Sequence, residues 1–125
     1  MTCLCDVSAI ELCQMMRAGD VSAREVLDSC LGRIEEINPA INAIVAMDVQ
    51  AAHIQADRAD RALRAGEEVG PLCGLPVGIK DTHVTAHLRT TFGSPIYANH
   101  VPEHDQGIVQ RLRAAGAVIV GKTNT

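Results

Sequence analysis

Apolar residues recur every three or four positions in three long stretches of the first half of the chain, with polar residues between them. This period matches one face of an α-helix, so we expect three amphipathic helices. The first two stretches begin with a Ser-x-x-Glu pattern, which is typical of a helix N-terminus. The expected helices run from Ser8 to Gly19, from Ser22 to Asn38-Pro39, and from Asp48 to about Ala65 before Gly66.

In the second half, short apolar runs bounded by Gly and Pro replace the helical period. The expected strands are Ile41 to Met47, which precedes the third helix, then Pro76 to Lys80 and Ala117 to Val120. Residues 82–104 are expected to form a loop with short strands. A fourth helix is expected to be capped by Asp105, to face inward through Ile108, Val109, Leu112 and Ala115, and to end at Gly116. Strands that alternate with helices predict an α/β fold with some parallel pairing.

The net charge of the chain bears on whether its partner is a nucleic acid. A formal net charge of −4 argues against direct binding of nucleic acid, which needs a concentrated basic surface. On the third helix, Asp57 and Asp60 lie four residues before Arg61 and Arg64, which predicts ion pairs on a solvated face. No apolar run is long enough to span a bilayer and no secretory signal opens the sequence, so we expect a cytoplasmic protein without membrane contact.

Five cysteines suit reduced thiols in a cytosolic protein better than a disulfide framework. Cys3-x-Cys5 could bind a metal, but no second Cys or His pair lies at the spacing of a zinc finger. The pairs His83/His87 and His100/His104 have a spacing that suits a metal only on helices, and neither segment has a helical pattern. We therefore expect no metal and no cofactor.

Lys80 is the candidate for chemistry. It ends an apolar strand, where partial desolvation would favour the neutral amine, and a neutral lysine can act as a general base toward a serine hydroxyl. Asp81 would point to the opposite face of the strand, and Gly78 leaves room beside the lysine. Alternatively, Lys80 is an ordinary strand-end residue whose amine reaches water.

Three segments set Lys80 in a wider context. Residues 70–81 read Gly-Pro-Leu-Cys-Gly-Leu-Pro-Val-Gly-Ile-Lys-Asp, residues 90–94 read Thr-Thr-Phe-Gly-Ser, and residues 111–124 read Arg-Leu-Arg-Ala-Ala-Gly-Ala-Val-Ile-Val-Gly-Lys-Thr-Asn. In order and spacing, these segments resemble the start of the amidase-signature family, which includes amidases and the A subunits of glutamyl-tRNA amidotransferases. The resemblance implies a mixed sheet flanked by helices. Residues 1–125 would form one partial domain, with a mainly helical part over 1–66 and the start of the core over 67–125.

The resemblance also implies a Ser–cisSer–Lys triad that hydrolyses the carbon–nitrogen bond of carboxylic amides, with Lys80 as the catalytic lysine. Both serines would belong to a Gly-Ser-rich block that residues 1–125 lack, so we expect an N-terminal fragment that is inactive alone. Ser94 matches a structural loop of the family and not its nucleophile. The expected partners are a small-molecule amide, and a homo-oligomer or amidotransferase subunits. The alternative is a non-catalytic interaction fragment that pairs through an open strand edge such as Ala117 to Val120.

Two positions depart from the family pattern. Cys73 stands where the family usually has His, a change that we expect to be tolerated. His87 stands where the family usually has Gly. A glycine in such a loop often has a positive φ, which a histidine adopts only with strain, so His87 puts the loop geometry in question.

Overall fold

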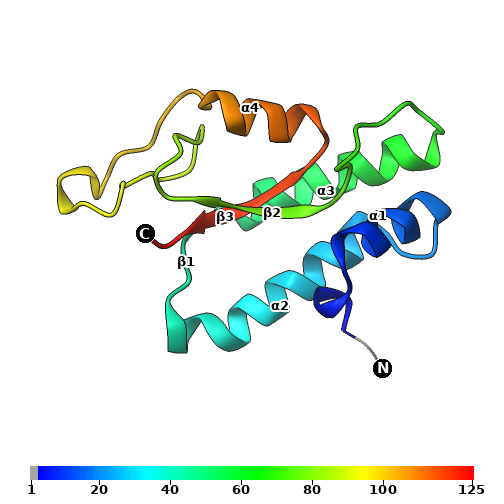
Figure 1. Cartoon of the computed structure of the whole chain (residues 1–125), viewed down its shortest axis with the longest axis horizontal. Coiled ribbons are helices and arrows are strands. Elements are labelled where there is room, and N and C mark those ends of the chain that lie inside the picture. The colour runs from blue at the N-terminus through cyan, green and yellow to red at the C-terminus, as the bar shows by residue number, and fades with distance from the viewer. Residues whose placement is uncertain (1–2) are drawn as a thin grey trace.

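The computed structural model describes residues 3–125 as a three-stranded sheet between two helical layers (Figure 1). The elements are the 3-10 helix η1 (Leu4–Asp6), α1 (Ala9–Ala18), α2 (Ala23–Ile41), β1 (Ile44–Met47), α3 (Val49–Arg64), β2 (Pro76–Lys80), the 3-10 helix η2 (Pro95–Tyr97), α4 (Gly107–Ala114) and β3 (Val118–Thr123). Within this part of the chain, none of the helices combines the length and the apolar character that crossing a bilayer requires. The expected α/β class is confirmed.

Alternation along β3 divides the core into two layers, because successive side chains of a strand face opposite sides. Val118 and Val120 pack with buried residues of α1, α2 and α3. Ile119 instead joins Ile79 of β2 and Val109 of α4 in a smaller cluster. Accordingly, α4 lies on one side of the sheet, and α1 and α2 lie on the other (Figure 1).

The sheet has the strand order β1-β3-β2, so β3 is the central strand. It pairs antiparallel with β1 and parallel with β2, with Lys80 opposite Thr123. Residues 118–120 pair with β2 on one side only, since β1 reaches no further than Gly121. On the other side the backbone N–H of Ile119 donates to the side-chain oxygen of Gln55 in α3 at 2.9 Å, so the edge expected to be open at residues 117–120 is partly capped by a side chain. Gly121 permits this arrangement, because a Cβ at this position would lie 2.5 Å from the carbonyl oxygen of Ala46 in β1.

In both expected capping boxes, the hydrogen bond accepted by the serine side chain is confirmed. Ser8 accepts a hydrogen bond from the backbone N–H of Glu11, and Ser22 accepts one from that of Glu25. The expected end of α2 at Asn38-Pro39 is wrong, since the helix continues to Ile41 with the proline inside it. A proline two residues before the last helical residue removes only one intrahelical hydrogen bond, and the chain leaves the helix at Asn42 with a φ of 49°.

Asn38 also explains why β1 begins at Ile44 and not at Ile41. Its side-chain amide donates to the carbonyl oxygen of Ile44 at 2.9 Å, and its side-chain oxygen accepts from the N–H of Ile44 at 2.8 Å. This pair of hydrogen bonds closes the turn between α2 and β1. Residues 42–43 form the turn.

Asp60 is not on the solvated face of α3, where the charge pattern placed it. Its side chain is buried, and its two carboxylate oxygens accept hydrogen bonds from the backbone N–H groups of Ala23 (2.7 Å) and Arg24 (3.1 Å). These are two of the four N–H groups that lack an intrahelical partner at the start of α2. Asp57, one turn earlier, pairs with the Arg24 guanidinium at 2.9 Å. Both aspartates thus bind α3 to α2.

Asp105 does not cap α4. The helix begins at Gly107 after Gln106, which makes no capping hydrogen bond through its side chain. Asp105 instead accepts from the backbone N–H of Ala86 at 2.7 Å and from Nε of Arg113 at 2.7 Å. The expected inward face of α4 is correct at Val109 but wrong at Ile108, which is 49% exposed.

Asp60 provides a stability test with an internal control. Asp60→Ala should lower the free energy of unfolding by about 1–3 kcal/mol, because two buried N–H groups lose their acceptor. Asp57→Ala removes a half-exposed ion pair on the same helix and should change stability by less than about 1 kcal/mol. Urea unfolding of both variants measures the difference, and equal losses would contradict the assigned role of Asp60.

Candidate functional site

Lys80 is the last residue of β2 and its side chain is exposed. Gly78 lies on the same face of the strand, and a Cβ added there would approach only the side chain of Thr123, at 3.0 Å. The space that Gly78 leaves is therefore bounded by the methyl group of Thr123. The expected desolvation of Lys80 is absent, because the described residues leave its side chain in contact with solvent.

Asp81 points to the opposite side of the strand end, as expected, and is 2% exposed. Its carboxylate accepts hydrogen bonds from both the backbone N–H (3.1 Å) and the hydroxyl of Thr91. Its backbone N–H donates to the carbonyl oxygen of Thr123, and its carbonyl oxygen accepts from the N–H of Phe92. Four contacts thus fix the residue that follows Lys80.

Lys122 is the buried lysine of this chain, with no exposed surface. Its Nζ donates to the carbonyl oxygen of His83 at 2.7 Å and to the Thr90 hydroxyl at 2.9 Å, and it lies 3.7 Å from an Asp81 carboxylate oxygen. Burial lowers the pKa of Lys122, and the neighbouring Asp81 carboxylate opposes that shift. Two of the three donors of the ammonium group are thus used in hydrogen bonds, and the Asp81 carboxylate adds an ion pair at 3.7 Å.

The Asp81–Lys122 pair was not anticipated from the sequence. Lys122 follows an apolar strand just as Lys80 does, and nothing in the one-dimensional pattern shows which of the two lysines is buried. The signal that could have found the pair is the parallel pairing of β2 with β3, which brings the ends of both strands to one edge of the sheet.

Residues 82–104 form a loop that holds only the short helix η2 and none of the expected strands. Arg89 ties the loop to β1 by donating from its guanidinium to the carbonyl oxygen of Val45, at 2.6 Å. His87 has a φ of 64°, which confirms that a histidine occupies a left-handed position here. Its backbone N–H donates to the carbonyl oxygen of Pro102 at 2.9 Å, so the strained residue is held by the far end of the same loop.

The histidine pairs are not joined by a third metal-binding side chain in the part of the chain described. His100 packs against the rings of Phe92 and Tyr97, with centroids 6.0 and 5.6 Å away. Among residues 3–125, the one cluster of three potential ligands is Cys3, Cys5 and Asp6, which lies in and beside η1. Ser94 begins η2 and accepts a hydrogen bond from the N–H of Ile96, which fits its expected structural role.

The two lysines allow a matched stability test. Lys122→Met leaves the Asp81 carboxylate buried without its cation and should lower the free energy of unfolding by about 3–5 kcal/mol. Adding Asp81→Asn to Lys122→Met should restore part of this loss. Lys80→Met is the same chemical change at an exposed position and should have an effect within about 0.5 kcal/mol. Similar losses in Lys122→Met and Lys80→Met would contradict the assignment.

The lowered pKa of Lys122 gives this site a pH dependence. Between that pKa and the ordinary value of 10.5, the unfolded chain holds more protons than the folded chain, so stability from this group rises with pH. Urea unfolding from neutral to alkaline pH should show this rise in the chain, relative to Lys122→Met. A parallel pH dependence of the two proteins would exclude it.

This chain is similar in sequence and in structure to known proteins. The sequence pattern of the family described as Amidase matches residues 25–125. The A subunit of glutamyl-tRNA(Gln) amidotransferase from Acidothermus cellulolyticus is 43% identical over 117 residues, which cover 94% of this chain and 23% of that protein. Its counterpart from a Geobacter species is 44% identical over 119 residues, covering 95% of this chain and 24% of that protein.

Solved structures agree with the sequence relatives. The peptide amidase of Stenotrophomonas maltophilia superposes with a TM-score of 0.88 at 33% identity, over 95% of this chain and 25% of that one. A bacterial aryl acylamidase of the amidase-signature enzymes gives a TM-score of 0.88 at 25% identity, over 95% of this chain and 25% of that one. This chain spans about a quarter of the length of these proteins. The chain belongs to the amidase family, as one part of the amidase-signature fold.

Proposed function

We propose that Lys80 acts as the general base of an amidase that hydrolyses the carbon–nitrogen bond of carboxylic amides. The observation that carries the proposal is the placement of Lys80, exposed at the carboxyl end of β2 beside the buried Asp81. In open α/β sheets, reactive groups gather at the carboxyl ends of strands. The family match supports the proposal because it covers residues 25–125, which include Lys80.

In the proposed mechanism, the neutral amine of Lys80 takes a proton from a bridging serine held across a cis peptide, and that serine activates the nucleophilic serine. The acyl-enzyme is then hydrolysed by water, with backbone N–H groups stabilising the oxyanion. A neutral lysine needs a desolvated site. In a full-length protein, the three quarters of the fold that these residues do not supply would cover Lys80.

The buried pair contributes positioning. A general base must lie within hydrogen-bond reach of the proton that it takes, and displacements of about 1 Å reduce rates strongly. Asp81 is held by Thr91, Thr123 and Lys122, so the backbone that carries Lys80 is fixed from the opposite face. In this proposal, the side chain is free to reach a serine while its Cα is not free to move.

A second candidate is one component of an amidotransferase, in which the ammonia released from an amide passes to an acceptor. It is supported by the relatives named as A subunits of glutamyl-tRNA(Gln) amidotransferase, at 43–44% identity. In this case the protein works with partner subunits in the cytoplasm. Both candidates share the amide hydrolysis step and the same lysine.

A chimera tests the shared step. Residues 1–125 replace the matching quarter of the Stenotrophomonas maltophilia peptide amidase, whose remaining part would supply the serines in this proposal, and ammonia release from a peptide amide is measured. Lys80→Ala should reduce kcat/KM about 10²–10⁴-fold, as expected for loss of a general base. Circular dichroism and the unfolding midpoint should match those of the parent chimera.

Arg111→Ala, an exposed change on α4, is the control and should leave activity unchanged. Full activity of Lys80→Ala would refute the role of the lysine. A folded parent chimera without activity would also count against the proposal, because it would show that this segment cannot serve an amidase.

A further inference from the structure

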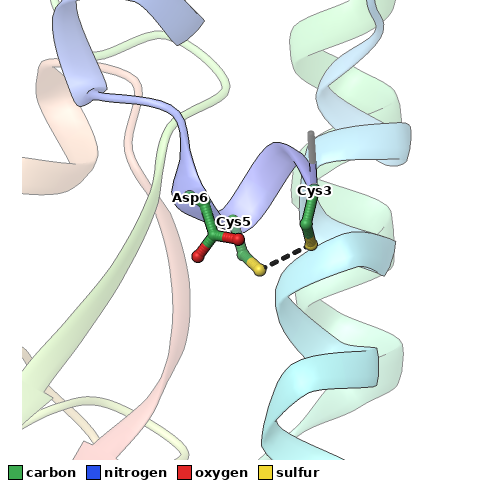
Figure 2. A group of neighbouring side chains, drawn as sticks. All are labelled: Cys3, Cys5 and Asp6. Atoms are coloured by element: carbon green, nitrogen blue, oxygen red, sulfur yellow. Dashed lines mark hydrogen bonds between the residues drawn. The ribbon is translucent and has the colours of Figure 1, made fainter. Parts of the chain in front are cut away.

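Two thiols meet at the start of the described chain. Cys3 Sγ lies 2.7 Å from Cys5 Sγ, and Figure 2 shows the two side chains turned toward each other beside Asp6. Cys3 is exposed and Cys5 is partly exposed, so small solutes can reach both. Neither the amidase match, which begins at residue 25, nor the site around Lys80 involves this pair.

The other three cysteines have no such contact among residues 3–125. Cys73 is buried, and Cys13 packs against the core and donates to the carbonyl oxygen of Pro71 at 3.9 Å. Cys30 is half-buried on α2, and burial raises the pKa of its thiol. The Cys3–Cys5 pair is therefore chemically distinct from the remaining thiols.

Ser29 of α2 organises the pair. Its hydroxyl oxygen accepts from the backbone N–H of Cys5 at 3.3 Å, so its own proton is available for Cys3 Sγ at 3.2 Å. Hydrogen bonds from the Cys5 thiol and then from Ser29 lower the pKa of Cys3, although the Asp6 carboxylate acts in the opposite sense. The same contact with Cys3 raises the pKa of Cys5. Cys3 is the more exposed of the two thiols and is the one whose sulfur contacts the Ser29 hydroxyl, so we assign it as the attacking thiol and Cys5 as its neighbour.

The separation of the two sulfurs favours a disulfide over a bound cation. A disulfide bond is about 2.05 Å long, whereas two thiolates on a tetrahedral zinc ion with bonds of about 2.3 Å lie about 3.8 Å apart. The observed 2.7 Å is closer to the first value. Cys3, Cys5 and Asp6 also supply only three ligands, and a structural zinc site takes four.

We propose that Cys3 and Cys5 form a redox-active dithiol that is oxidised by a small-molecule disulfide such as glutathione disulfide. The Cys3 thiolate attacks one sulfur of the small molecule, forms a mixed disulfide and releases one thiolate. Cys5 gives its proton to that thiolate and attacks the Cys3 sulfur. The Cys3–Cys5 bond forms, and the second small thiolate leaves and takes a proton from water. Two protein thiols lose two electrons and two protons, and the small disulfide gains them as two thiols.

Peptide mapping tests the proposal on the 125-residue chain. The reduced chain is equilibrated with graded mixtures of reduced and oxidised glutathione, acid-quenched, alkylated and cleaved on the N-terminal side of aspartate. Cleavage before Asp6 isolates residues 1–5, whose only cysteines are Cys3 and Cys5. This peptide should lose two hydrogens and take no label in mixtures where the peptides of Cys13, Cys30 and Cys73 remain fully alkylated. Oxidation no easier than at Cys13 would overturn the proposal.

Three variants separate the roles. Cys5→Ser should stop at a mixed disulfide on Cys3, whereas Cys3→Ser should leave Cys5 alkylated. Ser29→Ala should slow the alkylation of Cys3 at neutral pH roughly three- to tenfold and move its pH profile upward, since one pKa unit changes the thiolate fraction about tenfold. Identical behaviour of Cys3→Ser and Cys5→Ser would contradict the assignment of the attacking thiol.

A zinc titration tests the alternative that Cys3, Cys5 and Asp6 bind a cation. Zinc added to the reduced chain should not protect the two thiols from alkylation at one equivalent. If one equivalent protects both, and the glutathione mixtures produce no disulfide, the cluster is a cation site and the redox proposal is wrong.

Discussion

The buried pair of Asp81 and Lys122 is the interaction on which the rest of the site depends. It connects the end of β2 to the end of β3 and reaches the loop through Thr90, Thr91 and His83. Placing two ions in a protein interior requires strong compensation, and replacing such a pair by apolar residues is often neutral or stabilising. We infer that the pair serves to fix one arrangement of this strand edge more than to add stability. Its consequence is that Lys80 is the neighbour in sequence of a residue held by hydrogen bonds and an ion pair.

The local features of the fold were predictable because they depend on neighbouring residues. The Ser8 and Ser22 caps, the Asp48 cap of α3 and the stop at Gly66 all follow from side chains within a few positions of the helix ends. The question about the loop geometry at His87 came instead from the family pattern, which usually has Gly at this position, and His87 has a φ of 64°.

The errors lie where long-range contacts decide the outcome. Asp60 has the spacing of a solvated ion pair with Arg64, yet it is buried at the N-terminus of α2, thirty-six residues or more before it in the chain. Asp105 stands at the position expected of a helix cap, yet its carboxylate accepts a hydrogen bond from the backbone N–H of Ala86 in the loop. Lys80 and Lys122 both end apolar strands, and only the pairing of β2 with β3 determines which one is buried. Asp60, Asp105 and Lys122 each bind partners that no local pattern specifies.

The central claim is that Lys80 is exposed and Lys122 is buried. The reactivity of each side chain can be measured directly, because the sequence has no other lysine. A limited reaction of the folded chain with an amine-acylating reagent, followed by peptide mass spectrometry, reports both. The account predicts rapid acylation of Lys80 and acylation of Lys122 only when denaturant is added. Comparable rates at the two lysines in the folded chain, or faster reaction at Lys122, would contradict it.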